Sequence, residues 1–214
     1  NDKFNVIIGW RQNCLKDINA KRRIVWLHDV PMNGMFNKDN CNDFDWLLVL
    51  SEFHKTLIPE CVDRSKIFVS SNGINLTDFN NEQIRNSKRI IHTSSYDRGI
   101  QHLLIMWKDV IAEVPDAELH LYYGWNTYDE MVKKGVRSPD FKIAMKNLMN
   151  QINVFDHGRI GHKQLAKEFL RSGIWAYPSH FEEISCISAM KAQAAGCVPV
   201  CTNYAALKET VKTG

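Results

Sequence analysis

A loop between a predicted strand and a strongly periodic helix carries residue types that suit a phosphate group. The loop is Thr93–Gly99, with Ser95 and Arg98 ahead of Gly99. Free backbone N–H groups and the helix dipole favour an anion at such a helix start, and a guanidinium presents a fork of donors matched to phosphate. An ordinary N-cap beside a surface arginine is the alternative. The sequence has neither a P-loop nor a G-x-G-x-x-G run, which argues against a dinucleotide site.

A second segment, Pro178–Gly196, combines carboxylates with small residues. Glu182 and Glu183 precede a helix that we expect over Ile184–Ala195, and its small side chains allow close backbone approach by a ligand or a neighbouring element. Acidic residues at a helix start also complement the helix dipole. One glutamate would suffice for that role, so a second one beside His180 indicates more than capping.

The elements that position these loops alternate between apolar strands and amphipathic helices. Four continuous apolar runs predict strands covered on both faces: Asn5–Gly9, Arg23–Leu27, Trp46–Leu50 and Lys66–Ser70. The basic triplet Lys21-Arg22-Arg23 precedes the second run, and we interpret it as a solvated helix end. A nucleic-acid interface would need a clustered basic face, so we expect no nucleic-acid partner.

After a polar, linker-like stretch near residues 76–88, the alternation restarts. A helix begins at Ile100, and its apolar residues lie at offsets of 3, 4, 7, 10, 11 and 14, which trace one helical stripe. Further strands are expected over 89–93, 117–123, 154–157, 174–177 and 198–201, and helices over 139–151, 163–172 and 205–212. Repeated strand-then-helix units predict parallel, doubly wound sheets. The linker divides them into domains at 1–76 and 77–214, with ligands expected at the carboxyl ends of the strands.

Composition sets the class of protein. The chain has 214 residues and a net charge of +3, and no apolar run approaches the length of a membrane span. Its six cysteines form no C-x-x-C pair. Three of them lie near the C-terminus, where buried, reduced thiols are expected, so the sequence favours a cytoplasmic protein.

Several ordered motifs resemble the retaining GT-B glycosyltransferases of family 4. Pro178-Ser179, Glu183 and the Gly196–Val200 run fit that family's signature. Leu50–His54 is similar to its end-of-strand serine motif, and Ser71–Asn75 to its turn into the second domain. Asp97-Arg98-Gly99 stands at the position of the family's phosphate-binding Lys-Gly or Arg-Gly motif. His28 follows a predicted strand, as does a histidine near the donor sugar in relatives. The likeness runs from about Arg23 to the end of the chain.

The resemblance implies a GT-B-like α/β fold with two Rossmann-like domains, the first of them truncated. It implies a hexosyltransferase-type glycosyltransferase of polysaccharide biosynthesis. Such an enzyme would move a sugar from a UDP- or GDP-sugar to a glycan, lipid or polysaccharide acceptor with retention, without a metal or other cofactor. His28 and Glu183 would be the catalytic residues. The donor-binding residues would be Ser95, Arg98, Gly99, Arg159, Ile160, Glu183, Ile184, Ser185, Cys186 and Lys191.

Two residues depart from the family pattern. Lys191 stands in place of a second glutamate, eight residues after Glu183. That glutamate accepts hydrogen bonds from ribose hydroxyls, whereas an ammonium only donates. Lys191 therefore puts ribose binding in doubt and leaves a phosphate as its alternative partner. Thr93 stands where many relatives have an arginine.

The chain is also shorter at both ends than the family pattern. A catalytically inactive nucleotide-sugar-binding or assembly module is therefore the alternative to a working transferase, and an epimerase with the same fold is a more distant third. A truncated first domain suggests self-association through its exposed sheet edges, and a lipid acceptor would bring peripheral membrane contact.

Overall fold

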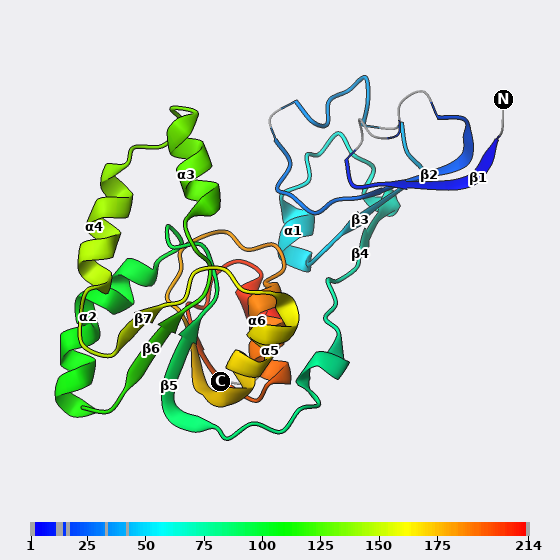
Figure 1. The fold of residues 1–214 in the computed structure, drawn as a ribbon. Coiled ribbons are helices and arrows are strands. Elements are labelled where there is room, and N and C mark those ends of the chain that lie inside the picture. The colour runs from blue at the N-terminus through cyan, green and yellow to red at the C-terminus, as the bar shows by residue number, and fades with distance from the viewer. Residues whose placement is uncertain (1–2, 12–14, 16–17, 33, 42, 213–214) are drawn as a thin grey trace. The chain divides into compact units, whose positions relative to one another are not determined.

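The computed structural model describes residues 3–11, 15, 18–32, 34–41 and 43–212. The chain divides into two compact units, each built on a parallel sheet (Figure 1). Unit 1 comprises Asn1–Gly73, Glu182–Cys186 and Ala205–Thr210, and unit 2 comprises Ile74–Phe181, Ile187–Tyr204 and Val211–Gly214. The predicted α/β fold with two parallel sheets is confirmed, whereas the domain boundary at 76/77 stays a prediction. Cys14 lies outside the described residues.

Sheet A, in unit 1, has four parallel strands in the order β1-β2-β3-β4. These are β1 (Phe4–Gly9), β2 (Ala20–Trp26), β3 (Trp46–Val49) and β4 (Ile67–Val69), with the 3-10 turn η2 (Arg64–Lys66) before β4. All four predicted strands form. The basic triplet was assigned wrongly, because β2 begins at Ala20 and places Lys21, Arg22 and Arg23 in a strand instead of at a helix end.

One face of sheet A carries the core of unit 1, and the other face is open. Val25, Leu47 and Val49 are fully buried on the core side. On the other side Phe4, Val6, Ile8, Trp46 and Phe68 are between 41% and 58% exposed. The expectation that these strands are covered on both faces is therefore wrong for the described residues, because a continuous apolar run does not reveal which of its faces a neighbour covers.

A short helix in unit 1 is capped from a distant part of the chain. Helix α1 (Glu52–Thr56) begins after Ser51, whose side chain accepts a hydrogen bond from the His54 backbone N–H. The Glu209 carboxylate, in α7 (Leu207–Thr210), accepts from the backbone N–H groups of Glu52 and Phe53, each at 2.7 Å. A carboxylate at this position satisfies two unpaired donors and complements the helix dipole.

Sheet B, in unit 2, has five parallel strands in the order β7-β6-β5-β8-β9. They are β5 (Asn86–His92), β6 (Glu118–Leu121), β7 (Val154–Asp156), β8 (Ser172–Tyr177) and β9 (Val198–Cys201). The accompanying helices are α2 (Ile100–Glu113), α3 (Asn126–Lys133), α4 (Asp140–Met149), α5 (His162–Arg171) and α6 (Ile187–Ala194), with the turn η3 (Leu76–Phe79) ahead of β5. The chain leaves β5 for β6 and β7 on one side and returns to β8 and β9 on the other.

Helices cover both faces of sheet B (Figure 1). Ile100, Leu104 and Trp107 of α2 are buried with strands β5, β6 and β8, and helix α4 adds Met145 and Met149 to the same core. The predicted stripe of α2 is confirmed, since its remaining apolar residues pack against this core. Helices α5 and α6 pack on the opposite side, against β5, β8 and β9.

Several elements differ from the sequence predictions. Strand β5 begins at Asn86, three residues before the predicted start, and α7 covers only Leu207–Thr210 of the helix predicted over 205–212. Helix α6 begins at Ile187, three residues later than expected. The reason is that the backbone ahead of it bonds elsewhere: the Asn72 side chain donates to the Ser185 carbonyl, and Ala206 N–H donates to the Glu183 carbonyl. Helix α3 forms after β6, where no helix was predicted from the sequence. Among the described residues, no helix has both the length and the apolar character to cross a membrane.

Candidate functional site

The strand order of sheet B points to one edge of unit 2. The order in which strands are added reverses at β5, because β6 and β7 lie on one side of it and β8 and β9 on the other. Open α/β sheets bind ligands at the carboxyl ends of strands at such a switch point. Strand β5 ends at His92 and β8 ends at Tyr177. The predicted anion-binding loop, with Ser95, Arg98 and Gly99, follows β5 directly, so the fold places it at this edge.

Gly99 holds the loop after β5 against the loop after β8. It is the N-cap of α2 and has a φ of 97°, a conformation that glycine tolerates best. A Cβ at this position would lie 2.2 Å from the Pro178 carbonyl oxygen, so a side chain cannot be accommodated without movement of the backbone. The start of α2 therefore approaches the Pro178 backbone closely. A helix start carries unpaired amides that favour an anion.

Arg98 is oriented by an aromatic ring. Its guanidinium carbon lies 3.8 Å from the centroid of the Phe181 ring, within the range of a cation–π contact. Phe181 N–H in turn donates to the buried Ser179 hydroxyl at 3.1 Å. The Pro-Ser motif thus shapes the loop that carries Phe181. Sequence reasoning did not select Phe181, although it lies between the motif and Glu183.

Tyr96 connects three loops at the same edge. Its hydroxyl donates to the Asp156 carboxylate at 2.6 Å and accepts from Gly124 N–H at 3.1 Å, so the ends of β5, β6 and β7 share one side chain. Burial, together with the Asp156 carboxylate, raises the pKa of Tyr96 and keeps its hydroxyl protonated as a donor.

A cavity of about 250 Å³ lies beside the predicted nucleotide loop in unit 2. It brings together three predicted site residues, Arg159, Ile160 and Lys191. Its other lining residues were not predicted: Thr93 had been noted only as a departure from the family pattern, and Tyr122, Tyr123, His162, Leu165, Ile187 and Ser188 complete the wall. Aromatic and apolar side chains thus enclose a space into which two cations reach.

Lys191 and His162 contact each other at the rim of this cavity. The Lys191 ammonium donates to His162 Nδ1 at 3.2 Å. Burial lowers the pKa of Lys191, and Asp78 partly offsets this effect. Sequence reasoning could not find His162, because the pair forms only through the packing of α5 on α6.

Beneath the cavity, a buried polar network supports Tyr122. The Tyr122 hydroxyl donates to Glu168 at 2.8 Å and accepts from Arg89 at 2.9 Å, while Arg89 and Glu168 form an ion pair that is largely buried. Burial first, and the neighbouring Glu168 next, raise the pKa of Tyr122. This network fixes one wall of the cavity.

The remaining predicted residues belong to unit 1. His28 follows β2, is exposed, and has its ring centroid 5.0 Å from that of Trp26. Glu183 is 8% exposed, and Ile184, Ser185 and Cys186 follow it within the segment that groups with this unit. The predicted residues are therefore divided between the two units, and the cavity in unit 2 brings together only Arg159, Ile160 and Lys191. Within the described residues, no group of three or more His, Cys, Asp or Glu side chains is placed to hold a metal ion.

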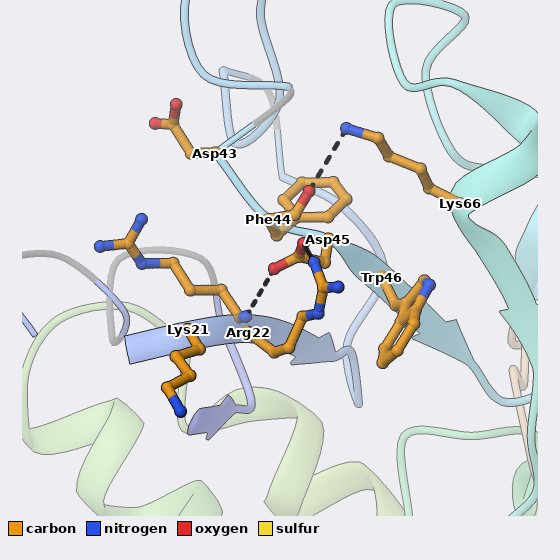
Figure 2. A pocket seen from close by; sticks show the side chains of 8 residues that line it. Lys21, Arg22, Asp43, Phe44, Asp45, Trp46 and Lys66 are labelled. Carbon is orange, nitrogen blue, oxygen red and sulfur yellow. Dashed lines mark hydrogen bonds and ion pairs between the residues drawn. The ribbon is translucent and has the colours of Figure 1, made fainter. Parts of the chain in front are cut away.

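Unit 1 contains a basic cavity of its own, of about 590 Å³, lined in part by Lys21, Lys66 and Trp46 (Figure 2). It lies at the amino-terminal ends of β2 to β4, away from the edge where such sheets bind ligands. Asp45 occupies part of it, accepting from Arg22 at 3.0 Å and from Arg23 N–H at 2.8 Å. The Arg23 amide, then Arg22, lower the pKa of this carboxyl. The cavity contains none of the predicted site residues.

Comparison with known proteins identifies the family of unit 2. Residues 79–214, more than half of the chain, match the family described as glycosyl transferases group 1. A search of curated proteins gives no match.

Solved structures share the fold over nearly the whole chain. HepE of Anabaena in complex with UDP and glucose is 16% identical with a TM-score of 0.70, and the match covers 98% of this chain and 62% of that one. A TarM variant of S. aureus, in complex with fondaparinux, α-GlcNAc-glycerol and UDP, is 18% identical with a TM-score of 0.67 over 95% and 42%. Sucrose-phosphate synthase of Thermosynechococcus elongatus is 16% identical, also at 0.67, over 94% and 54%. The chain thus spans less than two thirds of these relatives.

Proposed function

Because the chain belongs to the family of group 1 glycosyl transferases, we propose that it binds a nucleotide-sugar donor and transfers the sugar to an acceptor with retention. The observation that carries the proposal is the edge of sheet B, where a helix start, Arg98 and a cavity with two cations lie on neighbouring loops. Such an arrangement suits a nucleoside diphosphate, and UDP is present in the HepE and TarM structures.

The proposed chemistry is stabilisation of a departing nucleoside diphosphate. As the glycosidic bond breaks, negative charge develops on the leaving phosphate, and preorganised donors aimed at that charge lower the barrier. Arg98, Ser95 and the amides after Gly99 would supply these donors. The stacking of Arg98 on Phe181 limits the rotamers of the guanidinium before the donor binds. These groups would perform the role without a metal or another cofactor.

The remaining roles follow the resemblance residue by residue. Glu183 would hold hydroxyls of the transferred sugar, and the segment Ile184–Cys186 would contact the sugar and diphosphate. Arg159 and Ile160 would lie against the base of a UDP- or GDP-sugar, with Lys191 in the same cavity. His28 would face the sugar, and a glycan or lipid would be the acceptor. The thiol of Cys197 is buried and forms no disulfide, in keeping with the proposed reducing cytoplasm.

A second candidate function is a nucleotide-sugar-binding module without turnover. It is favoured by Lys191, which cannot accept hydrogen bonds from ribose hydroxyls as the family's glutamate does. The two candidates share donor binding and differ only in transfer, so a single series of measurements separates them.

Donor binding is tested by calorimetric titration with UDP, GDP, ADP, their sugar conjugates and NAD. We expect a nucleoside diphosphate to bind and NAD to give no signal; the absence of any response to the diphosphates would refute the donor site. Turnover is tested by donor hydrolysis in the wild type and in His28→Ala and Glu183→Ala. Equal rates in all three proteins would refute the catalytic assignment, and binding without hydrolysis or transfer would establish the inactive module.

A further inference from the structure

The cavity beside Lys191 is lined by cationic but not by acidic side chains. Two of its lining residues, Arg159 and Lys191, are cationic, and none of the lining residues is an aspartate or a glutamate. Among the described residues, no carboxylate lies within ion-pair distance of either cation. The Lys191 ammonium donates to His162 Nδ1, and Asp78 offsets its positive charge only from beyond ion-pair distance.

The position of Lys191 makes this charge costly in the empty cavity. The side chain is partly buried, and burial disfavours the charged form, as the lowered pKa of Lys191 shows. An anion in the cavity would replace lost hydration with direct contacts, whereas a neutral ligand group would not. The cavity is therefore better suited to an anion than to a sugar hydroxyl.

A buried hydroxyl at the same cavity supplies independent support. Thr93 is 9% exposed and lines the cavity, and its Oγ1 atom is buried without a hydrogen-bond partner in the structure. Buried hydroxyls are nearly always hydrogen-bonded, so a group bound beside Thr93 would satisfy this one. Ser188 adds a second hydroxyl, one turn before Lys191 on the same face of α6.

We propose that the Lys191 cavity binds a phosphate group, with the Lys191 ammonium as its main contact and the Thr93 hydroxyl as a second donor. His162 acts as a positioning residue that holds the ammonium at the cavity rim. The inference rests on the proposed function only for the molecule to which the phosphate group belongs, which would be the nucleotide of the donor. The sequence left open whether Lys191 contacts the ribose or a phosphate, and under this proposal it binds a phosphate and makes no contact with the ribose.

The test is a calorimetric titration of the full chain with inorganic pyrophosphate, UDP and uridine. The proteins are the wild type, Lys191→Gln, Lys191→Glu and the control Lys167→Glu, which makes the same charge change at an exposed position of α5 outside the cavity. We expect Lys191→Gln to weaken pyrophosphate and UDP by about tenfold and Lys191→Glu to weaken them further, because a charge-assisted hydrogen bond is lost. Uridine should be unaffected, and Lys167→Glu should bind like the wild type.

A variant of Thr93 tests phosphate binding at a second residue of the cavity, in case substitution of Lys191 lowers affinity only by disturbing the structure. Thr93→Val keeps the shape of the side chain and removes the hydroxyl, and we expect it to weaken pyrophosphate by about three- to tenfold. The inference is overturned if Lys191→Glu tightens UDP, or if the Lys191 and Thr93 variants bind pyrophosphate like the wild type.

Failure of the proposed function would look different. If pyrophosphate binds in a Lys191-dependent way while UDP binds no better than pyrophosphate and uridine not at all, the phosphate site stands without a nucleotide donor. If UDP binds and the variants do not change its affinity, the donor site stands and the phosphate inference fails. If no phosphate compound binds the wild type, both are refuted.

Discussion

The Arg98 guanidinium lies 3.8 Å from the centroid of the Phe181 ring, and so one loop at the edge of sheet B orients a cation carried by the next. A cation–π contact of this kind is worth roughly 0.5–2 kcal/mol. Its main effect here is to restrict the guanidinium before a ligand arrives, and it can therefore be measured through ligand affinity.

Phe181→Leu should weaken the binding of UDP by about 2- to 10-fold, because Arg98 loses its aromatic support. Titration calorimetry measures the change. Phe155→Leu is a matched control, since Phe155 is 41% exposed like Phe181 but lies on β7. An equal loss of affinity in both variants would contradict an orienting role for Phe181.

Gly99→Ala should destabilise the chain by more than about 3 kcal/mol, since it combines a left-handed φ with a clash against Pro178. Gly135→Ala is the control, because Gly135 also has a positive φ, of 69°, but a Cβ there would meet nothing within 4 Å. It should cost only about 1–2 kcal/mol. Urea unfolding measures both, and similar losses would mean that the Pro178 contact relaxes easily.

His92 should make stability depend on pH below neutrality. It is fully buried, its Nδ1 contacts the Ala176 carbonyl, and burial lowers its pKa to about 4. In the unfolded chain the imidazole has a pKa of about 6.5, so the unfolded state binds the extra proton as the pH falls. The contribution is complete above about pH 6.5 and declines by roughly 3 kcal/mol as the pH falls to about 4.

Urea unfolding between pH 4 and pH 7 tests this expectation. Burial also lowers the pKa values of His54, His120 and His157, so the effect of His92 must be read as a difference from a variant. His92→Asn keeps a donor near the Ala176 carbonyl and removes the titration. Its stability should fall less steeply with acid; a parallel decline would assign the pH dependence to the other histidines.

Glu168→Gln should destabilise unit 2 by about 3 kcal/mol. The substitution leaves the Arg89 charge, whose side chain is 14% exposed, without its carboxylate. It also replaces one of the two acceptor oxygens near Arg89 and the Tyr122 hydroxyl by an NH2 group, which cannot accept a hydrogen bond. Asp116→Asn breaks the exposed Lys88–Asp116 pair and should cost less than about 1 kcal/mol. Thermal and urea unfolding compare the two. A small loss for Glu168→Gln would show that water reaches Arg89.

The sequence was most informative where structure is decided locally. The stripe beginning at Ile100 predicted α2 almost to the residue, and the loop after β5 was correctly placed between a strand and a helix. The strand order could not be predicted, because an apolar run does not show which other strands pair with it. For the same reason the open face of sheet A, with Phe4 and Trp46, was missed.

The candidate site shows the same limit. Arg98 and Gly99 could be selected because they adjoin each other between a strand and a helix. His162 and Lys191 are 29 residues apart and meet only after α5 packs on α6. The unsatisfied hydroxyl of Thr93 likewise depends on tertiary burial, which no local pattern reports. The roles of the selected residues remain predictions until ligand binding is measured.

The cap that Glu209 places on α1 has a consequence for synthesis on the ribosome. The carboxylate lies 157 residues after the first amide that it binds, so α1 lacks this cap until all the residues between them have been translated. At about 5–20 residues per second, unit 1 waits roughly 8–30 seconds for it. Unit 1 therefore cannot reach its final form before Glu209 has been made, although its four strands precede those of unit 2 in the chain.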